Sequence, residues 1–216
     1  MINIEQQEKL FLAIGRELKK KLIVYAVGGT AMMFLGLKES TLDVDLVFEN
    51  EKDRQNFRKA SEALGYKEFN AFTVYGEKNN APEMLTLGKE RLDLFLYKVI
   101  KFVFSENMKQ RAKQTHQFEN LIIKISNPHD LILMKCATDR VKDNDDVMSI
   151  LQNVRITFDI VIDEAQHQIE LGNKTASFEL GCFLEEIHRI NNKLVPIEVL
   201  KKLFELVKEQ AEAHKK

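Results

Sequence analysis

The 216-residue chain has 44% hydrophobic and 30% charged residues and a net charge of −1. This balance is typical of a globular protein and excludes polyanion binding through overall charge. No apolar run approaches the ~20 residues that a membrane-spanning helix needs. The N-terminal segment MINIEQQEKL lacks the basic start and apolar core of a signal peptide, so we expect a cytoplasmic protein with no membrane partner. The widely separated Cys136 and Cys182 predict neither a zinc site nor a disulfide.

The first part of the chain alternates segments of helical and strand periodicity. The predicted helices span residues 4–20, 30–35 and 51–64. The predicted strands span residues 22–27, 41–48, 71–76, 91–100 and 119–126. In the strand at 41–48, we expect Leu42, Val44 and Leu46 to face the core. This alternation predicts an α/β (α+β) fold, with a mixed sheet and flanking helices.

The pattern becomes helical after Asn127-Pro128. Two helices are predicted within 128–153, with Pro128 near the start of the first. Three more are predicted at 157–171, 176–191 and 197–213. We therefore expect an α/β domain over residues 1–125 and an all-helical domain over residues 126–216.

Two acidic residues stand out on the strand at 41–48. Residues i and i+2 of a strand point to the same face, so Asp43 and Asp45 project together. At ~4 Å and an effective dielectric constant near 20, two carboxylates repel each other by about 4 kcal/mol. A divalent cation such as Mg²⁺ would remove that penalty. Asp93, flanked by Leu92 and Leu94, would join them if its strand lies alongside.

A pair of glycines precedes this acidic strand. Gly28 and Gly29 allow the backbone to approach a ligand closely. The helix expected from Thr30 would direct free N–H groups toward a phosphate. Thr30 itself is predicted to cap that helix or to donate its hydroxyl to a phosphate oxygen.

The arrangement Val-Gly-Gly, thirteen residues that begin with Thr30 (30–42), Asp-Val-Asp-Leu and a later strand Asp resembles the nucleotidyltransferase superfamily that includes DNA polymerase beta. The resemblance covers residues 27–46 and Asp93, and it implies the small mixed sheet of that superfamily. It also implies that Gly28 and Gly29 bind the triphosphate of an NTP. Asp43 and Asp45 would hold two Mg²⁺ ions, with Mn²⁺ as the other candidate, and Asp93 the ion nearest the attacking hydroxyl.

A second segment, PHDLILMKCATDRVKDNDD, resembles the region after the catalytic strands in abortive-infection toxin nucleotidyltransferases. The resemblance implies a phosphate contact for Lys135 and an Arg-then-acid element made by Arg140 and Asp143. Lys142 and Asp146 are further candidates. The alternative is a solvated charged helix in which Lys135 pairs with Asp139, four residues later.

These features favour a Mg²⁺-dependent nucleotidyltransferase that acts on an RNA, protein or small-molecule hydroxyl. The resemblance extends to a toxin–antitoxin role with a cognate antitoxin as partner, while the oligomeric state stays open. A basic excess of +4 within residues 98–124 leans weakly toward RNA and is otherwise a solvated face. The alternatives are a catalytically silent nucleotidyltransferase-like module that binds a nucleotide, RNA or a protein, and an interaction protein that uses its helical part alone.

Overall fold

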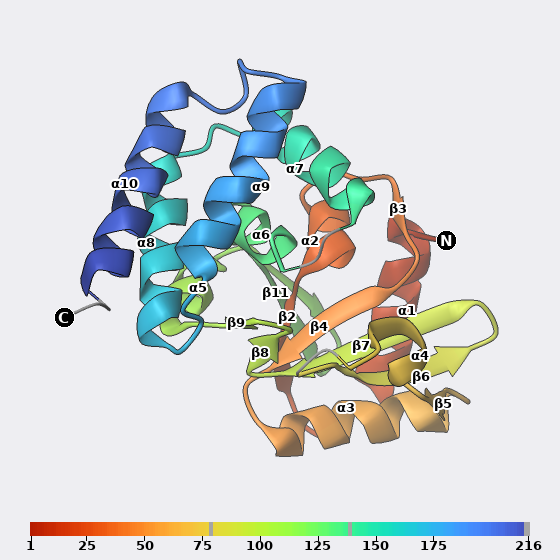
Figure 1. The fold of residues 1–216 in the computed structure, drawn as a ribbon. Coiled ribbons are helices and arrows are strands. Elements are labelled where there is room, and N and C mark those ends of the chain that lie inside the picture. The colour runs from red at the N-terminus through yellow and green to blue at the C-terminus, as the bar shows by residue number, and fades with distance from the viewer. Residues whose placement is uncertain (78–79, 138–139, 214–216) are drawn as a thin grey trace. The chain divides into compact units, whose positions relative to one another are not determined.

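The computed structural model describes residues 1–77, 80–137 and 140–213, and it divides into two compact units, Met1–Asn127 and Pro128–Lys216 (Figure 1). Within the described part of the first unit, seven strands form one mixed sheet. In their order across the sheet they are β10 (Thr115–Phe118), β11 (Leu121–Ile125), β2 (Leu22–Ala26), β4 (Val44–Phe48), β7 (Glu90–Leu96), β6 (Glu83–Leu87) and β5 (Lys67–Phe69).

The centre of the sheet sets the register on which the site depends. β2 is antiparallel to β4, and β4 is parallel to β7. The β4–β7 pairing places Val44 opposite Leu92 and Asp45 opposite Asp93. The apolar members of both strands, such as Val44 and Leu92, are buried. Each strand therefore fixes its acidic side chain by burying its neighbours.

Helices α1 (Ile4–Glu17) and α3 (Glu51–Ala63) contact each other and the sheet. A capping box between Asn3 and Gln6 starts α1, and its Phe11 and Ile14 are buried. The remaining helices of the first unit are α2 (Gly28–Phe34), α4 (Phe72–Tyr75) and α5 (Glu106–Arg111). Two short pairs of strands, β1 (Ile2–Asn3) with β3 (Ser40–Thr41) and β8 (Lys98–Val99) with β9 (Phe102–Val103), complete its described elements.

The described part of the second unit is helical. Its elements are α6 (Pro128–Lys135), α7 (Val141–Asn153), α8 (Phe158–Glu170), α9 (Ala176–Ile190) and α10 (Ile197–Ala213). Helix α8 contacts α6 and α9, and α9 also contacts α10. The predicted fold class, a mixed sheet with flanking helices followed by a helical part, is confirmed. None of the helices in the described residues combines the length and apolar character needed to cross a bilayer.

Some predicted elements differ from the structure. Residues 71–76 were expected to form a strand because of their aromatic and β-branched content, but they contain helix α4. Phe72 and Val74 of α4 are exposed, so no buried sheet face selects a strand there. The strand expected from 41 begins at Val44, and Leu42 is 57% exposed instead of facing the core. Strands β5, β6 and β10 of the main sheet were not predicted, and β10 is largely polar.

The two cysteines should differ in reactivity. Burial raises the pKa of the Cys136 thiol well above its ordinary value, whereas Cys182 lies at the surface with a smaller rise. Because the thiolate is the reactive form, a maleimide should modify Cys182 in the native protein and Cys136 only after unfolding. Mass spectrometry of native and denatured samples checks this order, and native modification of Cys136 would contradict it.

Candidate active site

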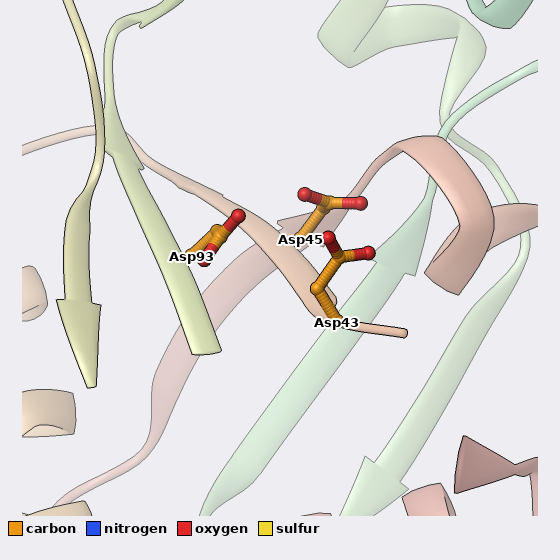
Figure 2. Close-up of side chains that lie close together, drawn as sticks. All are labelled: Asp43, Asp45 and Asp93. Carbon is orange, nitrogen blue, oxygen red and sulfur yellow. The ribbon is translucent and has the colours of Figure 1, made fainter. Parts of the chain in front are cut away.

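Three carboxylates meet where β4 and β7 run side by side (Figure 2). Asp43 immediately precedes β4, Asp45 lies on β4, and Asp93 lies on β7. One carboxylate oxygen from each lies within 4.8 Å of the others. Asp93 is completely buried, Asp43 is 7% exposed, and Asp45 is half-buried. The structure thus brings together the three acidic residues proposed from the sequence.

Two hydrogen bonds connect the start of α2 to the backbone of Asp45 on the acidic strand. The N–H of Val27 donates to the carbonyl oxygen of Asp45 over 3.1 Å. The N–H of Asp45 donates to the hydroxyl oxygen of Thr30 over 2.9 Å. Helix α2 begins at Gly28 with Val27 as its N-cap, so Thr30 does not cap it as expected. Thr30 instead holds Asp45 in place, and a phosphate contact of Thr30 stays a prediction.

The two glycines allow α2 to lie directly against the carboxylates. Gly28 has a φ of +54°, and a Cβ built on it would lie 2.5 Å from Oδ2 of Asp45. A Cβ on Gly29 would lie 2.4 Å from Oγ1 of Thr41, the hydroxyl that donates to Oδ1 of Asp43 over 3.3 Å. A Cβ at either position would therefore displace the side chain of Asp45 or Thr41, and at Gly28 the left-handed backbone conformation also favours glycine.

Replacing Gly28 with alanine should disturb both the fold and the site. We expect the left-handed conformation to cost about 1–2 kcal/mol of unfolding free energy, and the added Cβ to displace the Asp45 carboxylate. Gly36→Ala is the matched control, because Gly36 has a φ of +70° but no atom within 4 Å of its Cβ position. Denaturant unfolding should show that both variants are less stable than the wild-type chain. Titration should show weakened Mn²⁺ binding for Gly28→Ala alone. Equal metal binding by the two variants would contradict the role of Gly28.

Two side chains at the cluster were not anticipated from the sequence. Arg91 forms ion pairs with Asp43 and, with Nε 3.0 Å from Oδ1, with Asp93. The hydroxyl of Tyr75 donates to Oδ2 of Asp93 over 2.6 Å. The period-two rule places Arg91 on the same face as Asp93, so its position was detectable. Tyr75 gave no such signal, because its segment was expected to be a strand.

The cluster has the chemistry of a divalent-cation site. Carboxylate oxygens are the ligands that Mg²⁺ prefers, at 2.0–2.1 Å, so two opposite ligands of one ion lie about 4.2 Å apart. The carboxylate oxygens of Asp43, Asp45 and Asp93 lie close enough together for small local shifts to satisfy this geometry. The guanidinium of Arg91 neutralises part of the same charge, so it competes with a cation for Asp43 and Asp93.

The predicted nucleotide contacts at 135–146 lie in the second unit. Nζ of Lys135 donates to Oδ1 of Asp143 over 2.8 Å and also to Asp146. Nε of Arg140 donates to Oδ2 of Asp143 over 3.0 Å. Lys135 and both acids are buried, while Arg140 is exposed. Asp139, the other partner considered for Lys135, lies outside the described residues. A role of this cluster in nucleotide binding stays a prediction.

Comparison with known proteins found solved structures of similar fold. The antibiotic-resistance factor ANT(2″)-Ia is similar at 15% identity and a TM-score of 0.47 in complex with adenylyl-2″-tobramycin, over 83% of this chain and 98% of that one. Its solution structure is similar at 16% identity and a TM-score of 0.46, over 88% of this chain and 97% of that one. An antigenic nucleotidyltransferase-like protein from Paracoccidioides brasiliensis is similar at 14% identity and a TM-score of 0.49, over 93% of this chain and 94% of that one. No family model and no curated protein matches the chain. The likeness to these solved structures concerns the fold alone.

Proposed function

We propose that the chain is a divalent-metal-dependent nucleotidyltransferase, which moves a nucleoside monophosphate from an NTP to an acceptor hydroxyl and releases pyrophosphate. The observation that carries this proposal is the meeting of Asp43, Asp45 and Asp93 beside the turn at Gly28. Three buried or half-buried carboxylates at one place are costly unless a cation binds there.

The three aspartates would hold Mg²⁺ or Mn²⁺, and two ions are the number that the superfamily resemblance implies. When bound, such ions neutralise the charge that develops on a transferring phosphoryl group. Thr30 and Thr41 keep Asp45 and Asp43 in position through their hydrogen bonds. The Thr30 contact fixes the backbone of Asp45, and the Thr41 contact fixes the carboxylate of Asp43. Both reduce the reorganisation that binding requires.

The start of α2 would bind the phosphate tail. The first helical hydrogen bond runs from the N–H of Ala31 to the carbonyl oxygen of Val27, over 3.1 Å. Gly28, Gly29 and Thr30 come before this bond, so their N–H groups have no carbonyl partner within α2. Such N–H groups at the start of a helix can bind an anion. Asp93 would accept the proton of the attacking hydroxyl, since the superfamily resemblance assigns to Asp93 the metal ion nearest to that group.

The acceptor and the cellular role belong to the same proposal. An RNA end, a protein side chain or a small molecule would each supply the hydroxyl, and a toxin–antitoxin role in the cytoplasm follows from the family resemblance. The basic excess within 98–124 supports RNA less than the sequence implied. Lys109 is paired with Glu49 and Glu106, and Lys124 lies over the ring of Tyr25.

A second candidate function is a catalytically silent module that binds a nucleotide or a partner through the same fold. The ion pairs of Arg91 with Asp43 and Asp93 favour it, because an internal cation also stabilises an acidic cluster. The two functions differ in what Mg²⁺ does. An enzyme must exchange the guanidinium for a metal, whereas a silent module has no need to.

Incubation of the purified chain with α-labelled NTPs, Mg²⁺ or Mn²⁺, and a panel of RNA, protein and small-molecule hydroxyls tests the proposal. We expect label transfer together with pyrophosphate release, and loss of both in excess EDTA. Tight NTP binding with no pyrophosphate release from any NTP would support the silent module instead.

A further inference from the structure

We propose that Tyr75 is itself an acceptor of the transferred nucleotide, so that the chain modifies its own tyrosine. This inference rests on the proposed nucleotidyltransferase function and gives it a protein substrate. The hydroxyl of Tyr75 donates to Oδ2 of Asp93 over 2.6 Å. Asp93 is the carboxylate assigned to the attacking hydroxyl, so Tyr75 presents its oxygen where an acceptor would lie.

The surroundings of Tyr75 direct its side chain to the cluster. In the four-residue helix α4, Phe72, Thr73 and Val74 are exposed, whereas Tyr75 is half-buried. Its ring packs edge-on against Phe95, with centroids 6.1 Å apart and an interplanar angle of 89°. Phe95 follows Asp93 by two residues on β7, so both side chains project from the same face. One face of β7 thus positions both the ring and the hydroxyl of Tyr75.

Other tyrosines have different surroundings. Tyr66 donates its hydroxyl to Glu90, which is not one of the three clustered acids. Tyr97 is 50% exposed, so its hydroxyl is accessible without a placement at Asp93. Exposure therefore favours Tyr97 as a substrate for an external enzyme, whereas geometry favours Tyr75 for self-modification. The site of modification separates the two cases.

The step requires an NTP and no other reactant. The Oη atom of Tyr75 attacks the α-phosphorus, and an Oη–P bond forms. The bond between the α-phosphorus and the oxygen that bridges to the β-phosphate breaks, and pyrophosphate leaves with that electron pair. The phenol proton passes to the Asp93 carboxylate. The product is a tyrosyl nucleoside monophosphate ester, and its bulk beside Asp93 would slow further transfer.

The test uses the full chain with each α-labelled NTP and Mg²⁺ or Mn²⁺, followed by intact mass and peptide mapping. We expect a mass gain of one nucleoside monophosphate on the peptide that contains Tyr75. The label should fall about 100-fold or more in Tyr75→Phe, because the positioned nucleophile is lost. Tyr97→Phe is the matched control and should keep the label. Peptide mapping of the wild-type chain needs no variant, so a folding defect in Tyr75→Phe does not decide the result.

The outcomes separate this inference from the proposed function. Transfer to an external acceptor with Tyr75 unmodified would overturn self-modification and leave the enzyme in place. An absence of any pyrophosphate release would overturn both, and a label on another residue would overturn the role of Tyr75. Metal-free tyrosine emission gives a readout besides activity, since the chain has four tyrosines and no tryptophan. A carboxylate partner quenches tyrosine emission. Asp93→Asn should therefore raise the emission when it is introduced into the wild-type chain, but not when it is introduced into the Tyr75→Phe variant. An equal rise in both backgrounds would contradict the contact between Tyr75 and Asp93.

Discussion

Replacing Asp45 with asparagine is expected to lower nucleotide transfer by about 10³-fold or more. The substitution keeps the size of the side chain and leaves the backbone N–H that donates to Thr30. It removes one of three charges that would hold the metal, and a loss of about 4 kcal/mol of transition-state stabilisation corresponds to that factor. Initial rates of label transfer at saturating NTP and Mg²⁺ measure the effect.

Asp163→Asn is the matched control for this substitution. It makes the same chemical change on helix α8, where Asp163 is exposed. We expect its transfer rate to equal that of the wild-type chain, as is usual for surface substitutions. A wild-type rate in Asp45→Asn as well would show that the acidic cluster does not perform the chemistry.

In the absence of metal, the Asp45→Asn variant should be more stable than the wild-type chain. Asp45 lies within 4.8 Å of Asp43 and Asp93, so loss of its charge relieves repulsion in the metal-free protein. We therefore expect a higher melting temperature in EDTA and a smaller rise on addition of Mg²⁺. An inactive but more stable variant would indicate a site that keeps unfavourable charges for function.

The acidic cluster was largely predictable because strand periodicity is a local property. Asp43 and Asp45 share a face by the period-two rule alone, and the strand around Asp93 was recognised by its apolar neighbours. The sequence could not supply the register that sets Asp45 opposite Asp93, because strand pairing depends on contacts distant along the chain. Helix and strand types were therefore easier to predict than the distance between the carboxylates.

The contacts that were not predicted within each unit depend on tertiary structure. Residues 71–76 have strand-like composition, yet their exposure leaves no sheet face to bury, and the segment forms α4 with Tyr75 turned toward Asp93. Lys135 meets Asp143 and Asp146, eight and eleven residues later, across the break between α6 and α7. Side chains on one helix interact with partners three or four residues away, so helical periodicity does not predict pairs at these larger separations.

Arg91→Met should make the stability of the protein depend on metal. Without metal, loss of the guanidinium leaves Asp43 and Asp93 without this cation, and we expect about 3 kcal/mol of lost unfolding free energy. Mn²⁺ should bind about tenfold more tightly, since it no longer displaces an internal cation, and tenfold corresponds to about 1.4 kcal/mol. Thermal melts in EDTA and in excess Mg²⁺, with Mn²⁺ titration calorimetry, measure both effects.

Arg58→Met separates metal dependence from the general loss of an ion pair. Arg58 pairs with Glu62 and Glu68, and its side chain is 23% exposed, close to the 21% of Arg91. We expect Arg58→Met to be destabilised equally with and without Mg²⁺, whereas Mg²⁺ should restore Arg91→Met. If Mg²⁺ fails to restore Arg91→Met, the guanidinium is a permanent partner of the acids and the silent module is favoured. If it does restore the variant, Arg91 occupies the site in place of a metal, and the cluster is built to exchange one cation for another.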